Sequence, residues 1–363
     1  MVIIIDTNLS KHLKELNIKK RTELKKSILI GSRNITENKL SIFSVVHFKK
    51  TDENELTSLT ISDEELNQFK TLKYMLPYLL EIVGIIFYTD KEITDFTIKS
   101  CCNKLLTICP ITLILIQLPQ KTIYYQIINN KLQEIKIQEE SISIENMLSF
   151  IYTLEFEAPN EVLKNQSELK KTLYSGIDLH WDKTQFNVNE NNSIITLQMK
   201  KNPIERIIEL MIPSEDKKLT NKTETGKIFL AYDLHMNFYI PTDIKSKKLN
   251  EIKPIIKDAL KQDLLIKLQR STFDENDKRL KTPDKISLKF FGIELNTYLS
   301  KENPSKYEYE LCNSLIKHAD IMALFGFTLQ SRILLRDLEV YYDILKDKAK
   351  QNEIRDLISK MSK

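Results

Sequence analysis

Residues 75–88 read MLPYLLEIVGIIFY, and the order of polar and apolar positions in this segment predicts the class of fold. Pro77 is expected to stop a helix that begins at the acidic run Asp63-Glu64-Glu65, because proline has no backbone N–H for helical hydrogen bonding. From Leu79 to Tyr88 the chain is almost continuously apolar, which is typical of a strand covered on both faces. A helix followed directly by such a strand predicts a layered α/β architecture.

The segments on either side of residues 75–88 alternate in the same way. A basic helix is predicted over residues 8–25. Short apolar runs predict strands over residues 2–5, 27–30, 40–48, 111–118, 122–128 and 132–137. We therefore predict a first domain of α/β (α+β) class over residues 1–155.

The rest of the chain has a different pattern, which predicts a second, β-rich α+β domain over residues 172–337. A polar stretch from Ala158 to Lys171 is the candidate boundary. The clearest strand runs from Lys227 to Ile240, with apolar and polar side chains alternating. Further strands are predicted over residues 174–181, 186–188, 195–199 and 286–295, with 186–188 and 195–199 forming a hairpin. A carboxyl-terminal region, 338–363, is predicted as one charged helix from about Leu338 to Met361.

Composition excludes several classes of function. Lys plus Arg number 54 and Asp plus Glu number 50, and the resulting charge of +4 is spread along the chain, so nucleic acid is not an expected partner. The 6 glycines are too scattered for a phosphate-binding loop, and no cofactor is expected. Four cysteines and no signal-peptide pattern predict a cytoplasmic protein. No transmembrane segment is expected, because the most apolar runs are shorter than the ~20 residues that span a bilayer.

The sharpest local motif is a repeated tripeptide, Asp178-Leu179-His180 and Asp233-Leu234-His235. If both copies lie on neighbouring strands, Asp178, His180, Asp233 and His235 could ligate one metal ion. The alternative is that both copies occupy the polar faces of half-buried strands. The other histidines give no motif: His12 and His47 are isolated, and His318 lies six residues from Cys312, on a different face of a helix.

Several segments resemble two related groups of proteins. The helix, Leu-Pro and Gly-Ile pattern of Met75 to Tyr88 resembles the amino-terminal, MPN-like region of long ubiquitin-fold-modifier (UFM) specific proteases and their odorant-receptor-trafficking (Odr) adaptors. The strands Val2 to Asp6 and Ile28 to Gly31 are similar to the start of the Odr adaptors. The strand from Lys227 to Ile240, and Ile286 to Leu295 followed by Tyr307 to Leu335, look like the region before the peptidase domain of those proteases. The resemblance implies an MPN-like first domain.

The comparison with these families also implies that no position of this chain matches a catalytic residue of the proteases. The proteases carry a Trp-Gly-Cys-Ala-Tyr-Arg-Ser nucleophile segment and a later Asp-Pro-His segment, and neither occurs here, since Trp181 is followed by Asp182. The Odr membrane tail and the His-x-His of metalloprotease MPN domains are also missing. The expected function is a non-catalytic adaptor or scaffold in UFM conjugation (UFMylation), as a protease partner or a protease-like chain without its peptidase domain. Through its partner it would reach the endoplasmic reticulum surface.

A surface for the protein partner, a UFM-specific protease or its adaptor, is predicted on the last helix or on an exposed strand edge of the first domain. The two apolar stripes of the helix leave Ile354, Leu357, Ile358 and Met361 for a partner groove if the other stripe is enough to hold the helix on the protein. Packing of both stripes on the chain's own second domain is the competing interpretation. Two other functions remain open: a metal-dependent hydrolase that uses the paired tripeptides, and a structural scaffold unrelated to the UFM pathway.

Overall fold

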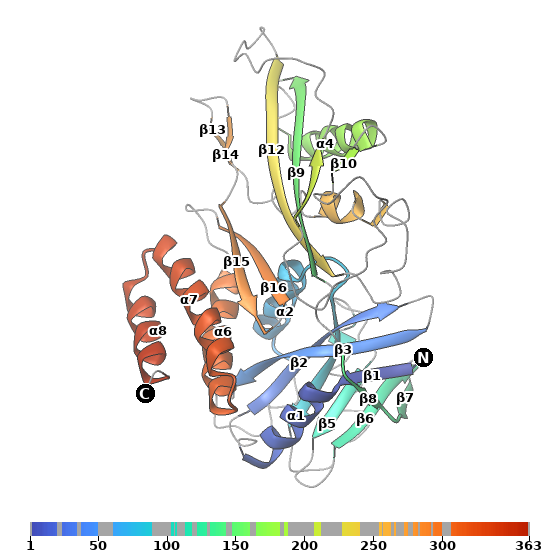
Figure 1. The fold of residues 1–363 in the computed structure, drawn as a ribbon, viewed down its shortest axis with the longest axis vertical. Helices are drawn as coiled ribbons and strands as arrows, with labels where there is room; N and C mark the ends of the chain where they lie inside the picture. Colours follow the sequence, from blue (N-terminus) through green and yellow to red (C-terminus); the bar gives the residue numbers. More distant parts are fainter. Residues whose placement is uncertain are drawn as a thin grey trace. The chain divides into compact units, whose positions relative to one another are not determined.

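The structure is a computed structural model with two compact units (Figure 1). It describes residues 2–19, 24–34, 38–49, 61–88, 103–104, 106, 113–117, 122–128, 131–142, 147–159, 165–181, 185–187, 207–211, 227–239, 254–255, 257–262, 265, 272–274, 279–281, 284–291, 293–299 and 306–361. The first unit comprises Met1–Ile144, Ile286–Thr297 and Lys301–Lys363. The second comprises Glu145–Lys285 and Tyr298–Ser300. The mixed α/β class predicted from the sequence is confirmed.

The first unit is built on an eight-stranded mixed sheet in the order β7-β6-β5-β4-β2-β3-β1-β8. Its strands are β1 (Val2–Asp6), β2 (Leu24–Asn34), β3 (Lys39–Lys49), β4 (Glu81–Tyr88), β5 (Leu113–Gln117), β6 (Thr122–Ile128), β7 (Lys131–Glu134) and β8 (Gln138–Glu140). The central strand β4 is buried from Ile82 to Tyr88, as the apolar run predicted. It pairs antiparallel with β2 and parallel with β5. Gly84 permits close pairing, because an added Cβ would lie 2.6 Å from the Leu113 carbonyl oxygen.

Helix α2 (Asp63–Met75) has strong signals at both ends. Ser62 accepts a hydrogen bond from the backbone N–H of Glu65, and the Glu65 side chain accepts one from the backbone N–H of Ser62, which completes a capping box. The helix ends before Pro77, as predicted. Phe69, Leu72 and Met75 point into the core of the unit.

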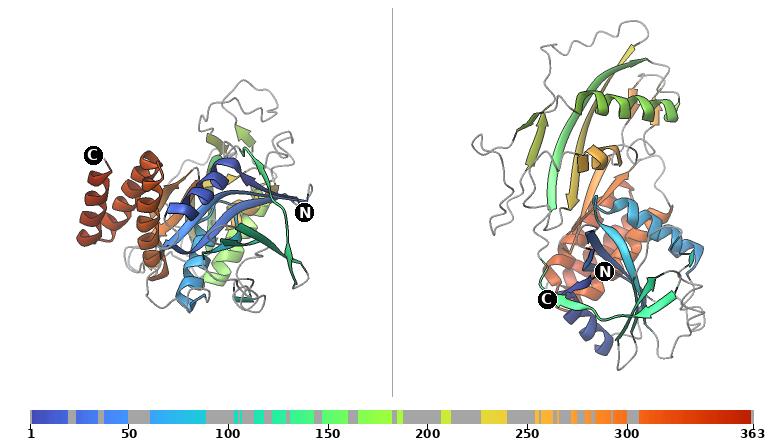
Figure 2. Two further views of the ribbon diagram at one scale, coloured as in Figure 1. Left: turned by 90° about the horizontal axis from the view of Figure 1, so that it is seen from below. Right: turned by 90° about the vertical axis from the view of Figure 1, so that its right-hand side faces the viewer.

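The other helices of the first unit with described bounds come from both ends of the chain. Helix α1 (Thr7–Lys19) follows β1 directly, and α6 (Lys306–Leu324), α7 (Thr328–Ile344) and α8 (Lys348–Lys360) lie side by side (Figures 1 and 2). Helix α6 packs on β3 and on α2. Its buried face includes Leu311, Leu315, Ala319 and Met322, as its apolar spacing predicts.

The second unit contains a four-stranded sheet in the order β10-β11-β9-β12. Strands β9 (Met147–Pro159) and β12 (Lys227–Tyr239) pair antiparallel along their full length, which confirms the long strand predicted there. The shorter strands are β10 (Gln185–Asn187) and β11 (Ile207–Met211), and β13 (Thr272–Asp274) pairs with β14 (Arg279–Lys281). Helix α4 (Gln166–Trp181) lies across one face of this sheet (Figure 2).

The strand predicted over residues 174–181 is wrong, since these residues end helix α4. Asn165 caps the helix by accepting hydrogen bonds from the backbone N–H groups of Ser167 and Glu168. Leu169, Leu173 and Ile177 are buried at a spacing of four residues. The helical period therefore prevails over the local alternation near Asp178.

Two other predicted elements differ from the structure, and a third lies partly outside the described residues. Residues 286–295 are two strands, β15 (Asp284–Phe290) and β16 (Ile293–Leu299), with a turn at Phe291, whose φ is 39°. The last helix is interrupted between α7 and α8, because Lys346 has a φ of 59° and Asp347 caps α8 by accepting from the Lys350 N–H. The described partner of β10 is β11, and residues 195–199 lie outside the described part of the chain.

The two units differ from the boundaries drawn on the sequence. The first unit ends at Ile144 and includes the carboxyl-terminal helices, while the polar stretch of residues 158–171 lies within the second unit. Folding domains of 1–155, 172–337 and 338–363 stay a prediction, which limited proteolysis of the full chain tests.

Candidate functional site

Three histidines that are far apart in the sequence meet inside the first unit. His12 lies on α1, His47 on β3 and His318 on α6. Their ring centroids are 5.3 Å apart for His12 and His47, and 5.2 Å apart for His47 and His318. All three are buried. The interpretation of His12 and His47 as isolated residues is therefore wrong, and we call His12, His47 and His318 the histidine cluster.

A chain of short polar contacts runs through the histidine cluster. The hydroxyl of Tyr88 lies 3.0 Å from Ser27 Oγ, which lies 2.7 Å from His47 Nδ1. His47 Nε2 lies 3.0 Å from His12 Nε2, so one of these two nitrogens donates a hydrogen bond to the other. These residues come from β4, β2, β3 and α1, and the sheet register places Ser27 directly opposite His47. The network is therefore a product of strand pairing.

His318 is bound in a different way. The backbone N–H of His47 donates to His318 Nδ1 at 3.1 Å. Strand β1 pairs with β3 only between Lys39 and Ile42, so β3 continues past its neighbour. The imidazole of His318 therefore provides an acceptor for a backbone donor on a part of β3 that β1 does not reach.

Phenylalanine rings surround the histidine cluster. Phe290 and Phe291 lie with their ring centroids 4.8 Å and 5.1 Å from that of His318. Phe325 and Phe327 lie edge-on to His12, at 5.3 Å and 5.7 Å. Such an apolar setting disfavours the charged form of an imidazole.

Burial shifts the titration of every ring in the cluster. It lowers the pKa of His12 to about 4, against a smaller opposing effect of the Glu15 carboxylate. Burial lowers the pKa of His318 to about 3, with a further contribution from His12. The pKa of His47 falls well below its ordinary value, first through burial and then through His318 and His12. Burial also raises the pKa of Tyr88. At neutral pH all three rings are uncharged.

The contact between Ser27 and His47 has the reach of a nucleophile and its general base. Ser27 and His47 are, however, both 0% exposed, so a substrate cannot reach the hydroxyl in this conformation. Within the described ranges, no group of three His, Cys, Asp or Glu side chains is arranged to hold a metal ion. The histidine cluster can bind protons, and its hydrogen bonds connect α1, β3 and α6.

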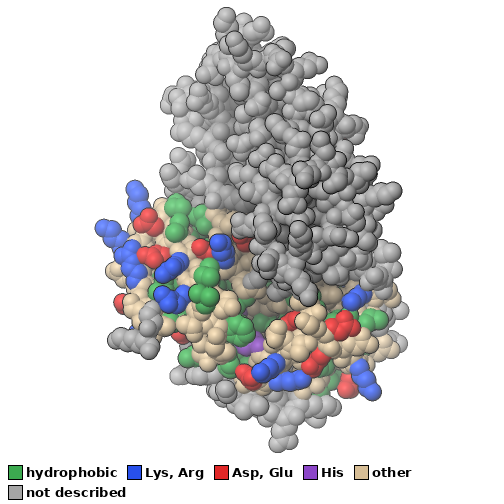
Figure 3. All heavy atoms as spheres, in the orientation of Figure 1, with side chains coloured by type: hydrophobic (Ala, Val, Ile, Leu, Met, Phe, Trp, Pro, Cys, Tyr) green, Lys and Arg blue, Asp and Glu red, His purple; other side chains and the backbone are tan. Residues whose placement is uncertain are grey.

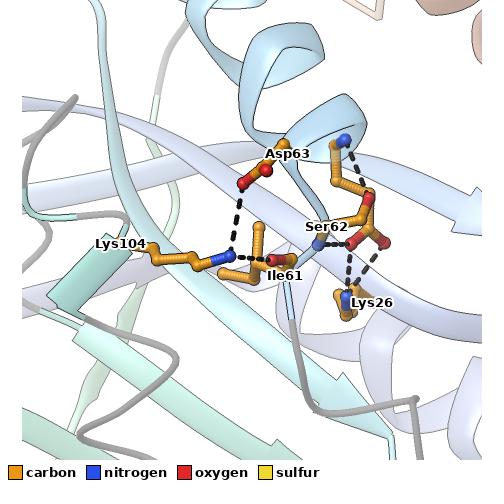
Figure 4. A network of polar contacts seen from close by, with 6 residues as sticks. Lys26, Ile61, Ser62, Asp63 and Lys104 are labelled. Carbon is orange, nitrogen blue, oxygen red and sulfur yellow. Dashed lines mark hydrogen bonds and ion pairs between the residues drawn. The ribbon is translucent and has the colours of Figure 1, made fainter.

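A second buried polar cluster lies where α2 begins (Figure 4). Lys26 is fully buried, and its Nζ lies 2.9 Å and 2.7 Å from the two carboxylate oxygens of Glu65. Nearby, Lys104 Nζ lies 3.3 Å from both the Ile61 carbonyl oxygen and the Asp63 carboxylate. Glu65 thus caps α2 and binds the helix to the sheet at the same time.

The tripeptides that predicted a metal site are in different kinds of element. Asp178 and His180 are on α4, where residues two apart point in different directions, whereas Asp233 and His235 are on β12. Asp178 pairs with Lys257 at 2.6 Å and with Lys261 at 2.7 Å. Hydrogen bonds from these lysines hold the pKa of Asp178 below its ordinary value. The two neighbouring strands that the metal hypothesis required do not exist.

The predicted partner surface lies on α8 and its carboxyl-terminal cap. Ile354 is 0% exposed, so it belongs to the core of the first unit. Leu357, Ile358 and Met361 are half-buried, and the residues between them are exposed. In the face shown in Figure 3, acidic and basic side chains are interspersed over the described surface rather than gathered by sign. In the described part of the chain no helix has the length and apolarity to cross a membrane.

The fold belongs to the mixed α/β class, with an eight-stranded sheet and carboxyl-terminal helices. It is similar to the crystal structure of UfSP from C. elegans, with a TM-score of 0.40 and 9% sequence identity over 87% of this chain and 56% of that chain. This chain thus spans about half the length of that protein. No protein-family model and no curated protein sequence matches this chain.

Proposed function

We propose that this chain is a non-catalytic adaptor of the UFM pathway, which binds a UFM-specific protease or acts as a protease-like chain without a peptidase domain. The link to the pathway rests on the sequence resemblance of Met75 to Tyr88 and of the strands Val2 to Asp6 and Ile28 to Gly31. The non-catalytic role is supported by the missing nucleophile and Asp-Pro-His segments and by one structural observation: the Ser27 hydroxyl beside His47 is completely buried. A nucleophile needs access to its substrate.

The partner surface is proposed on the part of α8 and its cap that the fold leaves accessible. Leu357 and Met361 are half-buried, four residues apart, and therefore lie on one side of the helix. Ile354, one turn earlier, packs into the core and holds that helix in place. An apolar pair on a helix that is firmly held is suited to insert into a groove of a partner protein.

Binding of the full chain to a purified UFM-specific protease tests the adaptor role. We expect a complex in size-exclusion chromatography, and a loss of affinity of at least about tenfold in Leu357→Asp and Met361→Asp, because a carboxylate would be buried in an apolar contact. Ser359→Asp adds the same charge at an exposed position of α8 and is the matched control. Absence of a complex with the unmodified chain would contradict the proposal, and an unrelated scaffold would then be favoured.

A second measurement tests the absence of catalysis. The full chain is incubated with a UFM-type precursor, and we expect no processing. Cleavage that is abolished by Ser27→Ala or by Cys312→Ala would show an active site and overturn the non-catalytic role. Cys312 is included because it is a free cysteine on α6, although burial raises the pKa of its thiol well above the ordinary value, which disfavours the nucleophilic thiolate.

A further inference from the structure

The hydrogen-bond pattern of the histidine cluster limits where protons can bind. A backbone N–H is always a donor, so His318 Nδ1, which receives the N–H of His47, must carry its lone pair. The proton of neutral His318 is therefore on Nε2, which has no hydrogen-bond partner in the described residues. Protonation of Nδ1 would place two N–H groups against each other and break the contact between β3 and α6.

A similar restriction holds between His12 and His47. Their Nε2 atoms are 3.0 Å apart, so a single proton fits between them. His47 Nδ1 contacts Ser27 Oγ, and a hydroxyl can act as donor or as acceptor. One extra proton is thus accommodated: His12 carries both of its protons, His47 donates to Ser27, and Ser27 donates to Tyr88. A second extra proton cannot be added without breaking a contact.

We propose that the histidine cluster is an acid-sensitive latch, which holds α6 on β3 while its rings carry at most one extra proton and releases α6 when a second proton binds. The latch acts on the fold and does not depend on the proposed adaptor role. Helix α6 leads into α7 and α8, so its release would free the helices of the carboxyl-terminal segment together.

The groups that face the cluster favour this behaviour. Among the described residues they are Glu15 on α1, which acts on His12, and Tyr88 on β4, which contacts Ser27. The segment around β15 and the turn after α6 contribute phenylalanine rings. Helix α2 contacts α6 through the neutral pair Gln68 and Ser314, 3.4 Å apart, and, at the start of α6, through the exposed ion pair of Lys306 and Glu64 at 3.8 Å. We call the state with α6 held on β3 the closed state and the state with α6 released the open state. Because Glu15 is the single carboxylate among the described groups that act on the rings, the positive charge of extra protons is poorly stabilised in the closed state.

Release also exposes the rings to water, where each binds a proton near its ordinary pKa of 6.5. The open state therefore binds more protons than the closed state below about pH 6.5. By linkage, each additional proton raises the opening equilibrium about tenfold per pH unit. With three rings, the equilibrium constant for opening should rise by roughly a hundredfold or more for each unit that the pH falls between about pH 6 and pH 5.

Hydrogen exchange of the full chain, followed by mass spectrometry from pH 7.5 to pH 5 and corrected for intrinsic exchange, tests the latch. We expect protection in α6 to fall by at least about a hundredfold per pH unit below pH 6 and to stay below that of β4 at every pH, because release of α6 needs less free energy than unfolding of the whole unit. A flat profile for α6, or protection of α6 equal to that of β4 at every pH, would overturn the proposal. We expect the same profile with and without EDTA, and a change caused by EDTA would assign the cluster to a metal ion instead.

Two variants separate the latch from general acid sensitivity. Asn at position 318 keeps an acceptor near the position of Nδ1, and Gln at position 12 keeps a polar atom near that of Nε2, but neither side chain titrates. We expect His318→Asn and His12→Gln each to reduce the pH dependence of protection in α6 by about tenfold per pH unit. His180→Gln, on α4, is the control and should leave this pH dependence unchanged. A pH dependence in both cluster variants equal to that of the unmodified chain would contradict the latch.

Discussion

Two adjacent residues of strand β2 connect helices to the sheet, one through a charged pair and the other through uncharged rings. Lys26 is buried as a cation and is paired with Glu65 of α2, while Ser27 contacts the neutral histidine cluster that links α1, β3 and α6. Consecutive residues of a strand point to opposite faces, so the two clusters do not share a surface. A buried lysine keeps its charge when a carboxylate lies beside it, whereas a histidine can be buried by giving up its charge. The two links should therefore respond to different changes.

The largest expected effect is the pH dependence of the histidine cluster. The folded state lowers the pKa of each ring, so between pH 7.5 and pH 5.5 the unfolded state binds protons that the folded state does not. Stability is then full above about pH 6.5 and is lost as the pH falls. The three rings together should reduce the free energy of unfolding by about 4 kcal/mol between these two pH values.

Urea unfolding followed by circular dichroism at the two pH values measures this difference. His12→Gln should decrease the pH-dependent loss by about 1.4 kcal/mol, the share of one ring. His180→Gln provides the control for loss of a histidine elsewhere. If His12→Gln left the pH dependence unchanged, the cluster would not be its source.

The next effect concerns the buried ion pair. Glu65→Ala leaves Lys26 buried without its carboxylate, which should destabilise the first unit by about 3 kcal/mol. Glu64→Ala removes the neighbouring acid, whose side chain is exposed, and should change stability by less than about 0.5 kcal/mol. Thermal unfolding at pH 7.5 compares the two variants, and equal melting temperatures would mean that Lys26 reaches water or another partner.

A smaller effect is expected for Ser27→Ala. The change leaves His47 Nδ1 and the Tyr88 hydroxyl without their shared partner and should cost about 2 kcal/mol. Ser32→Ala is a matched control on the same strand, since Ser32 is also buried but its Oγ has no hydrogen-bond partner among the described residues. Urea unfolding should rank Ser27→Ala clearly below Ser32→Ala in stability. The reverse order would show that the network contributes little.

The smallest effect is expected at the outer end of the network. Tyr88→Phe removes one hydroxyl but lets Ser27 donate to His47, so a loss of about 1 kcal/mol is expected. Tyr74→Phe removes a hydroxyl from an exposed tyrosine and should be neutral. A loss as large as that of Ser27→Ala would show that Tyr88 and Ser27 act as one unit.

The parts of the fold that the sequence predicted depend on local signals. The capped helix α2, the stop at Pro77 and the buried strand β4 are all encoded within residues 61–88. Helix α4 has such a signal as well, in the spacing of Leu169, Leu173 and Ile177, but the local alternation near Asp178 predicts a strand over the same residues. Asp347 similarly indicates the start of α8.

The histidine cluster had no local signal of this kind. The contact between His47 and His318 joins residues 271 positions apart, and no motif in either segment specifies it. It arises because β3 extends beyond β1 and α6 covers the unpaired part of the strand. The positions of the strands could be predicted from the apolar runs, although β2 extends well beyond residues 27–30, but which helix covers this part of β3 could not be predicted.

The division of the first unit into distant segments has a consequence for how the protein is made. On the ribosome, Met1–Ile144 is complete before the whole of Glu145–Lys285 is synthesised, and only then do the residues of α6 follow. At roughly 5–20 residues per second, the surface of β3 that α6 covers waits on the order of ten seconds or more for its partner. During that interval His47 has no acceptor from α6, and the nascent sheet presents an apolar face to which chaperones can bind.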